Sequence, residues 1–446
     1  MAASKTRVPV ARVLLWDQPA GAVAWDAERR MASFEYEEAF IRTGVQIAPL
    51  MMPLRSGIFS FPELKPETFR GLPGLLADSL PDRFGNRLID LWLQQRGRSL
   101  DDFSPVERLC YIGSRGMGAL EFKPALVRHS SQATRLEVGE LVAMAREILS
   151  DRFRLSTNLR RGKTEALNTI IRVGSSAGGA RAKAVINWNR QNGEIRSGQV
   201  AALPGFEPWI LKFDGVQDKS LGDPQGFGRV EFAYHRMALA AGIRMSECRL
   251  LEEGGRAHFM TRRFDRGNAG SKIHMQSLCA LGHYDFNEPG AYGYEQALSV
   301  IQQLNLGYPA LQEMFRRMVF NVLARNQDDH TRNIAFLMES DGRWRLAPAF
   351  DVIWAYSAGG KWTNRHQMRV NGKLDGFERS DLLSVASQFG IKDTTGIIDE
   401  VAAAISRWPK FANDAKVPAE MIKTVGGTHR MHLARGNKAG RKKSGT

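Results

Sequence analysis

The chain has 446 residues, of which 43% are hydrophobic and 24% are charged, a balance typical of a globular protein with two or three domains. No run of about 18 apolar residues exists, which excludes a membrane-spanning helix, and the amino terminus lacks the continuous apolar core of a signal peptide. The three cysteines are scattered and have no metal-ligand spacing. We therefore expect a cytoplasmic protein. An excess of 62 Lys and Arg over 47 Asp and Glu gives a net charge of +15, which favours an anionic partner such as nucleic acid or a nucleotide.

The first part of the chain predicts a small α+β domain at residues 1–125. Short apolar runs separated by turns between residues 8 and 47 indicate a β-meander. Apolar residues at helical spacing after Pro81 predict a helix around Leu88 and Trp92. An amphipathic helix at residues 136–149 leads out of this domain.

A second, β-rich domain is expected at residues 126–276, and it opens with a loop of small residues, Gly174–Arg181. A hairpin follows, with strands at 183–188 and 194–198 around an Asn192-Gly193 turn. Small residues let backbone N–H groups approach a phosphate, although the loop lacks the Gly-Lys-Ser/Thr sequence of a Walker A motif. Such a loop in isolation is more often simply flexible, so it does not establish a nucleotide site.

The next predicted strand, residues 208–213, carries Lys212 among apolar neighbours. This lysine either extends from an edge strand into solvent or reaches a phosphate. A helix is expected at 229–241, and a strand pair around a Gly-Gly turn ends at Arg263-Phe264-Asp265-Arg266. The order of Gly-rich loop, strand lysine, helix and strands is that of a kinase amino-terminal lobe.

From residue 277 the pattern becomes helical, and we expect a third domain at 277–433. Its predicted helices are 295–304, 311–323, 380–389, 395–407 and 418–425. The last residues, 434–446, are glycine-rich and basic, which predicts a disordered tail.

Within this third domain a polar loop carries Asp328 and Asn333, and a hairpin around Asp341-Gly342 leads to an isolated acid, Asp351. Phosphoryl transfer needs oxygen ligands for Mg²⁺ and a carboxylate that accepts the proton of the attacking hydroxyl. Protein kinases place a catalytic Asp, an Asn, a hairpin and a metal-binding Asp in this order. An isolated pair of this kind is more often a polar surface loop, so the loop alone does not establish a kinase.

Five motifs in this order resemble the HipA family of bacterial serine/threonine kinases, the toxins of HipBA toxin–antitoxin systems. The matching segments are Leu80–Gly85 (LPDRFG), Ser176–Lys183 (SAGGARAK), Arg263–Arg266 (RFDR), Asp328-x-His330-x-x-Asn333 and Phe350-Asp351-Val352. The resemblance covers nearly the whole chain. One departure is Arg181, where the family loop commonly has Gln.

The resemblance implies an α+β, bilobal protein-kinase-like fold with a small N-terminal β-rich subdomain and a mostly helical C-terminal lobe. It also implies ATP and Mg²⁺ as cofactors, with Asp328 as the catalytic base and Asn333 and Asp351 as the metal ligands. The implied nucleotide-binding residues are Gly178, Gly179, Ala180, Arg181, Ala182, Lys183, Lys212, Arg262, Phe264, His330, Asn333 and Asp351. Ser176 matches the loop serine that family members autophosphorylate, with Ser175 as the alternative acceptor. A phosphate with a charge of about −2 in this loop would compete with ATP.

The expected function is that of a non-specific serine/threonine protein kinase toxin. Family members bind a HipB-like helix-turn-helix antitoxin that carries them to operator DNA, and they phosphorylate aminoacyl-tRNA synthetases, which promotes growth arrest and drug tolerance. Two alternatives stay open on the sequence. One is a small-molecule kinase on the same fold, and the other is a non-catalytic nucleotide-binding corepressor partner of a DNA-binding antitoxin.

Overall fold

The computed structural model describes residues 8–81, 83–99, 103–127, 135–149, 169–171, 174, 181–216, 226–267 and 270–434. The chain divides into two compact units, and neither is continuous in sequence. Unit 1 comprises Met1–Gly228, Ser246–Asp285 and Ala335–Ala347, and unit 2 comprises Arg229–Met245, Phe286–Ile334 and Pro348–Thr446. None of the described helices is long and apolar enough to cross a membrane.

The first sheet of unit 1 contains the predicted meander. Its strand order is β4-β3-β2-β1-β5, and all neighbours are antiparallel. The strands are β1 (Val10–Leu15), β2 (Gln18–Asp26), β3 (Met31–Tyr36), β4 (Ile58–Phe59) and β5 (Leu120–Lys123). Local patterns predicted β1 to β3, whereas β5 joins the sheet from a distant segment.

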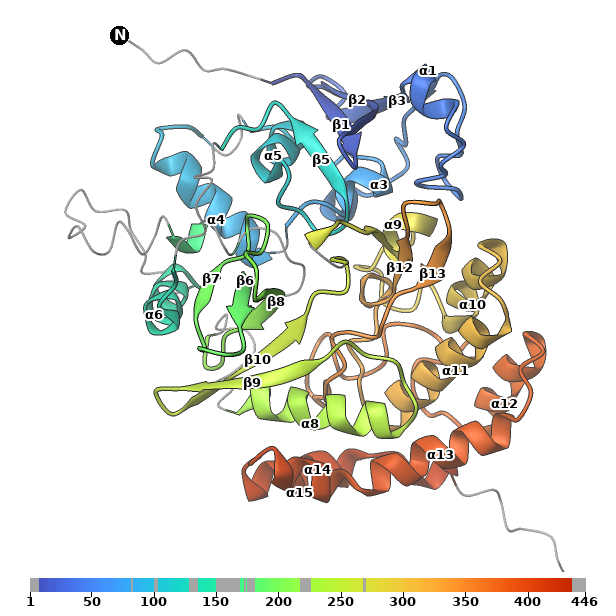
Figure 1. Ribbon diagram of the computed structural model, residues 1–446. Coiled ribbons are helices and arrows are strands. Elements are labelled where there is room, and N and C mark those ends of the chain that lie inside the picture. The colour runs from blue at the N-terminus through green and yellow to red at the C-terminus, as the bar shows by residue number, and fades with distance from the viewer. Residues whose placement is uncertain are drawn as a thin grey trace, which may run out of the picture. The chain divides into compact units, whose positions relative to one another are not determined.

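The second sheet of unit 1 has the order β7-β6-β8-β10-β9 (Figure 1). Its strands are β6 (Lys183–Asn189), β7 (Ile195–Ser197), β8 (Phe206–Lys212), β9 (Cys248–Glu253) and β10 (Arg256–Arg262). Both predicted hairpins are confirmed, because β6 pairs with β7 and β9 pairs with β10. Side chains such as Ile186, Trp209 and Leu211 form one buried cluster with residues of two helices, α4 and α6.

The helices of unit 1 are mostly short. They are α1 (Glu38–Ile41), α2 (Pro66–Phe69), α3 (Gly74–Ala77), α4 (Arg83–Gln94), α5 (Pro105–Ile112), α6 (Val138–Leu149) and α9 (Leu278–Gly282). The predicted helices α4 and α6 are confirmed. Helix α5 was not predicted, although its start carries a capping box: Ser104 Oγ accepts from Glu107 N, and Ser104 N donates to Glu107 Oε2.

A third, three-stranded sheet in unit 1 has the order β11-β12-β13. The predicted hairpin is confirmed, because β12 (Ala335–Met338) pairs with β13 (Trp344–Leu346) around Gly342, whose φ is 83°. Strand β11 (His274–Ser277) adds to β12 by long-range pairing that no local pattern predicted.

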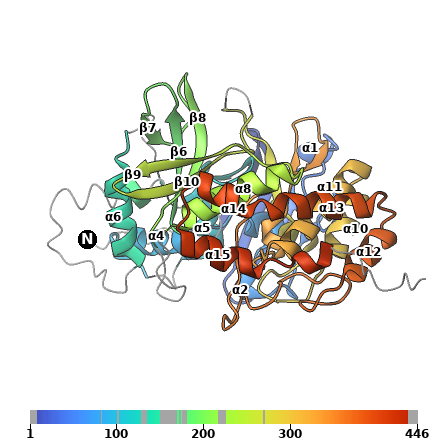
Figure 2. The ribbon, with the colours of Figure 1, turned by 90° about the horizontal axis from the view of Figure 1, so that it is seen from below.

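Unit 2 is built from helices, which confirms the predicted helical C-terminal part. They are α8 (Phe227–Ala240, from Arg229), α10 (Tyr294–Gln303), α11 (Tyr308–Leu323), η2 (Thr331–Asn333), α12 (Arg379–Gln388), α13 (Thr394–Ser406), α14 (Trp408–Asp414), α15 (Ala419–Thr428) and η3 (Met431–Ala434). Helix α11 is the centre of this unit, and α10 and α13 pack against it (Figure 2).

The end of α15 shows why local signals misplace some boundaries. The sequence predicted that this helix ends at Val425, but the helix continues through Gly426 and Gly427 to Thr428. A Cβ atom on Gly426 would lie 3.0 Å from Cδ1 of Trp408. The glycine therefore permits close packing on α14, which the sequence did not predict as a separate helix.

Candidate active site

The polar loop that contains Asp328 begins where α11 ends, and side chains from other segments bind the last carbonyl groups of that helix. Arg430 Nη1 donates to Val322 O at 3.0 Å, and Tyr234 Oη donates to Ala324 O at 2.7 Å. These donors replace the hydrogen bonds that a helix lacks at its carboxyl end. Arg325 then adopts a left-handed conformation, with a φ of 57°, and turns the chain out of the helix.

Backbone pairing and the side chain of Asn333 both help to fix the loop. Asn326 forms a parallel bridge with Ala355, and Gln327 N donates to Ala355 O at 3.1 Å. Asn333 Nδ2 donates to Asp328 O at 2.8 Å and closes the loop on itself. The amide of Asn333 thereby fixes the backbone of the predicted base.

The carboxylate of Asp328 faces solvent, since 41% of its side chain is exposed. The indole Nε1 of Trp362 donates to Asp328 Oδ1 at 2.6 Å. His330 Nε2 lies 3.8 Å from the same oxygen, and its ring is largely buried. Asp328 is therefore accessible to a substrate while one of its oxygens is held by the protein.

Asp351 has a φ of 52°, an unfavourable conformation for a residue with a side chain. The segments on both sides fix it there. Ala349 N donates to Arg244 O at 2.8 Å, and Ala355 N donates to Arg325 O at 3.1 Å. The backbone of Asp351 is thus held by hydrogen bonds on both sides, which fixes the position from which its carboxylate extends.

A pocket in unit 2 is lined by Asn326, His330, Asn333 and Asp351, among others. Two of its buried polar atoms, Asn326 Oδ1 and His330 Nδ1, have no hydrogen-bond partner among the residues that the structure describes. Among the described residues, no group of three or more His, Cys, Asp or Glu side chains could hold a metal ion. The amide of Asn333 and the carboxylate of Asp351 nevertheless fit Mg²⁺, which binds one or two protein oxygens together with phosphate oxygens.

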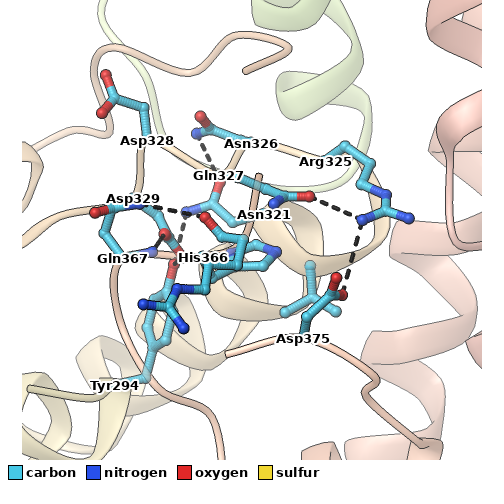
Figure 3. A network of polar contacts seen from close by, with 12 residues as sticks. Tyr294, Asn321, Arg325, Asn326, Gln327, Asp328, Asp329, His366, Gln367 and Asp375 are labelled. Atoms are coloured by element: carbon cyan, nitrogen blue, oxygen red, sulfur yellow. Dashed lines mark hydrogen bonds and ion pairs between the residues drawn. The ribbon is translucent and has the colours of Figure 1, made fainter. Parts of the chain in front are cut away.

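Beside this pocket lies a buried network around Asp329, which Figure 3 shows. Asp329 Oδ2 accepts from Tyr294 Oη at 2.9 Å and from His366 Nδ1 at 2.7 Å, and Gln367 N donates to Oδ1 at 2.8 Å. Burial alone would raise the pKa of Asp329, but His366 and these hydrogen bonds together lower it below its usual value. Sequence reasoning missed this network, because its members come from segments far apart in the chain.

Three of the nucleotide-binding residues predicted in unit 1, Lys183, Lys212 and Arg262, lie on its second sheet. Lys183 begins β6 and is buried, and it stands opposite Lys212 in the β6–β8 register. Lys212 Nζ lies 5.5 Å from the ring centroid of Phe259. Arg262 ends β10, and its backbone N donates to Glu247 O at 2.9 Å. The pairing of β6 with β8 thus brings the two predicted lysines together.

The structure describes only some of the other residues predicted for the glycine-rich loop. Arg181 and Ala182 precede β6, and the Arg181 guanidinium lies 5.1 Å from the ring centroid of Phe227. The candidates Ser175, Ser176, Gly178, Gly179 and Ala180 lie outside the described residues. The same holds for the tail from residue 435, which was predicted to be disordered.

The Arg263–Arg266 motif forms a buried ion-pair cluster around Asp265. Arg263 Nη2 and Arg266 Nη1 lie 2.7 and 2.8 Å from Asp265 Oδ2, and Gly118 N donates to the same oxygen at 2.8 Å. Burial opposes ionisation of Asp265, but the two guanidinium groups hold its pKa far below its usual value. The charged residues of this motif therefore hold unit 1 together. Phe264 is the second residue after the end of β10.

Two family models match the chain. The HipA N-terminal domain matches residues 11–123, and the HipA-like C-terminal domain matches residues 175–408. The β-rich N-terminal region and the helical C-terminal part with its polar loop are thus those of a known family. The chain belongs to the HipA family.

One solved structure agrees with this assignment, and two further proteins are similar to parts of the chain. One solved structure is the HipA chain of the Shewanella oneidensis MR-1 complex of HipA, HipB and operator DNA, which is 17% identical to this chain. The TM-score is 0.63, and the match covers 95% of this chain and 96% of that one. This similarity establishes a HipA fold. The Helicobacter pylori proinflammatory kinase CtkA is 13% identical over 53% of this chain and 92% of that one, and its TM-score of 0.34 does not establish a shared fold. A Haemophilus influenzae protein whose name marks it as a candidate kinase is 32% identical over 103 residues, which is 21% of this chain and 30% of that protein.

Proposed function

We propose that the protein is an ATP- and Mg²⁺-dependent serine/threonine protein kinase and the toxin of a toxin–antitoxin pair. The observation that carries this proposal is the arrangement in unit 2. An exposed carboxylate, Asp328, is joined through its backbone to Asn333, and Asn333 lines the same pocket as Asp351. A base and a pair of oxygen ligands are the parts that phosphoryl transfer requires.

In the proposed reaction, Asp328 accepts the proton of a serine or threonine hydroxyl as that oxygen attacks the γ-phosphorus of ATP. The bond from the γ-phosphorus to the bridging oxygen breaks, and ADP leaves with the electron pair. Asn333 and Asp351 would hold Mg²⁺, which would neutralise phosphate charge. Lys183, Lys212 and the loop before β6 would bind the phosphates, and His330 would line the nucleotide site.

Regulation and partners follow from the family. Ser176, with Ser175 as the alternative, is the proposed autophosphorylation site. The Shewanella relative was solved with HipB and operator DNA, and this chain is proposed to bind a HipB-like antitoxin and, through it, operator DNA. An aminoacyl-tRNA synthetase is the proposed substrate, and the cytoplasm is the proposed location.

The test is transfer of label from γ-labelled ATP with Mg²⁺, comparing the parent with Asp328→Asn and Asp351→Asn. Loss of one reacting group or metal ligand should reduce labelling at least about a hundredfold. Asp341→Asn is the matched control, because Asp341 lies in the exposed turn of the β12–β13 hairpin. Equal labelling by all four proteins would contradict the proposed mechanism.

A separate variant, Ser176→Ala, tests the autophosphorylation site. It should keep activity on an added protein substrate while losing most of the phosphate on the chain itself. If the phosphate persists, mass spectrometry should locate it on Ser175. Phosphate on neither serine would contradict loop autophosphorylation.

A further inference from the structure

Trp362 belongs to a segment that follows Asp351 and contacts the catalytic loop at two adjacent aspartates. Its indole N–H donates to Asp328, while His366 and Gln367 N donate to Asp329. The distance from Trp362 Nε1 to Asp328 Oδ1, 2.6 Å, is short for a hydrogen bond between a neutral donor and a carboxylate. A single short segment, residues 362–367, thus fixes both carboxylates.

The backbone on both sides of this contact is tied down. Gln367 Nε2 donates to the carbonyl oxygen of Trp362, and Gln327 Nε2 donates to Thr363 O at 3.3 Å. The indole therefore extends from a segment that is itself hydrogen-bonded to the loop that carries Asp328. A ring held in this way provides a fixed donor, which costs little conformational entropy when the substrate binds.

The two oxygens of Asp328 have different surroundings. Oδ1 accepts the indole N–H, whereas Oδ2 has no hydrogen-bond partner among the described residues. Figure 3 shows the Asp328 side chain pointing away from the buried Asp329 network. One oxygen is thus anchored and the other is open to a hydroxyl group.

We propose that Trp362 is the positioning residue for the catalytic base, holding Asp328 Oδ1 so that Oδ2 receives the proton of the substrate hydroxyl. The role rests on the proposed kinase function. A base that is oriented by a third group is a recurrent arrangement in enzymes with an activated hydroxyl. Without the indole donor, the exposed Asp328 side chain would sample other rotamers, and fewer encounters would have the productive geometry.

The kinetic test compares Trp362→Phe with Trp354→Phe. Phenylalanine keeps an aromatic ring, so the ring layer with His330, whose centroid lies 6.4 Å from that of Trp362, is largely preserved. Trp354 is a matched control in the same unit, because its Nε1 donates to Thr428 Oγ1 at 3.0 Å and does not contact Asp328. We expect Trp362→Phe to lower kcat for phosphotransfer about tenfold, because one hydrogen bond to a charged group is lost. The KM for ATP should be unchanged. Trp354→Phe should keep the parent kcat.

A second measurement does not depend on activity. The indole ¹H–¹⁵N resonance of Trp362, assigned by its absence in Trp362→Phe, should lie downfield and should move upfield in Asp328→Ala. The indole resonance of Trp354 should not move. If the chemical shift of the Trp362 indole is the same in Asp328→Ala as in the parent, the contact is overturned.

The kinetic outcomes separate the two proposals. If the parent is active and Trp362→Phe has an equal or higher kcat, the positioning role is overturned and the kinase function stands. A higher kcat would mean that the indole blocks the base. A parent that transfers no phosphate removes the kinase function, and this role with it.

Discussion

Asp329 Oδ2 lies 2.7 Å from His366 Nδ1, and both side chains are almost completely buried. Arg430 Nη1 lies 2.9 Å from His366 Nε2. Because a guanidinium can only donate, Nε2 must accept, and the imidazole proton is therefore on Nδ1 and directed at Asp329. Arg430 is in turn paired with Asp375, so this chain of contacts joins the polar loop after α11 to the segment before η3.

His366→Phe should therefore destabilise unit 2 strongly. The variant removes the donor to Asp329 and the acceptor of Arg430, and it leaves two buried charges with fewer partners. The expected loss is on the order of 3 kcal/mol in the free energy of unfolding, because breaking a buried polar pair is costly. A urea titration followed by tryptophan fluorescence measures this loss.

Two further variants sharpen this measurement. His366→Asn can still donate to Asp329, so it should lose less stability than His366→Phe. His432→Asn, at an exposed position in η3, should match the parent. If His366→Phe is as stable as the parent, the network does not hold the loop.

Replacing Asp351 with glycine should separate activity from stability. Glycine adopts a φ of 52° without steric cost, so the free energy of unfolding is expected to rise by up to about 1 kcal/mol. Phosphotransfer should fall at least about a hundredfold, because the carboxylate is lost. Calorimetry and the labelling assay measure the two effects on the same preparation.

The control for this variant is Arg30→Gly. Arg30 has the same φ of 52° in the exposed turn between β2 and β3, so the gain in stability should be similar and activity should stay intact. A large loss of stability in Asp351→Gly would mean that the carboxylate supports the fold.

The parts of the structure that the sequence predicted are those specified by local patterns. The Asp341-Gly342 and Asn192-Gly193 turns mark their hairpins, and apolar spacing marks α11 and α13. Strand β11 and helix α14 were missed. Strand β11 has only four residues of mixed polarity, and α14 has only seven residues from Trp408, so neither shows a clear hydrophobic periodicity.

The residues of the candidate site also fall into a group that the sequence predicted and a group that it did not. Asp328, Asn333 and Asp351 stand close together in sequence at motif spacing, and their roles stay predictions. Trp362 and His366 carry no motif, and their bonds to the loop exist only after the chain has folded. Tertiary contacts of this kind have no local signal in a single sequence.

The stability of unit 1 should depend on pH through its buried histidines, which include His274 and His283. Burial lowers the pKa of His274 and of His283 to about 4. His283 Nε2 accepts from Gly74 N at 3.1 Å, which requires a neutral ring. His274 Nε2 donates to Ile47 O at 3.0 Å, and it is the burial of the ring that favours its neutral form. Below their unfolded pKa of about 6.5, the unfolded chain binds protons that the folded chain does not.

Stability is therefore fully present above pH 6.5 and is lost as the pH falls toward 4. At pH 5 each histidine should cost on the order of 2 kcal/mol in the free energy of unfolding relative to pH 7. Urea titrations at several pH values measure this slope. His283→Gln, whose amide oxygen can still accept from Gly74 N, should reduce the proton uptake on unfolding by about one near pH 5. An unchanged slope in His283→Gln would mean that this imidazole is protonated in the folded protein, and its acceptor bond to Gly74 could not then exist.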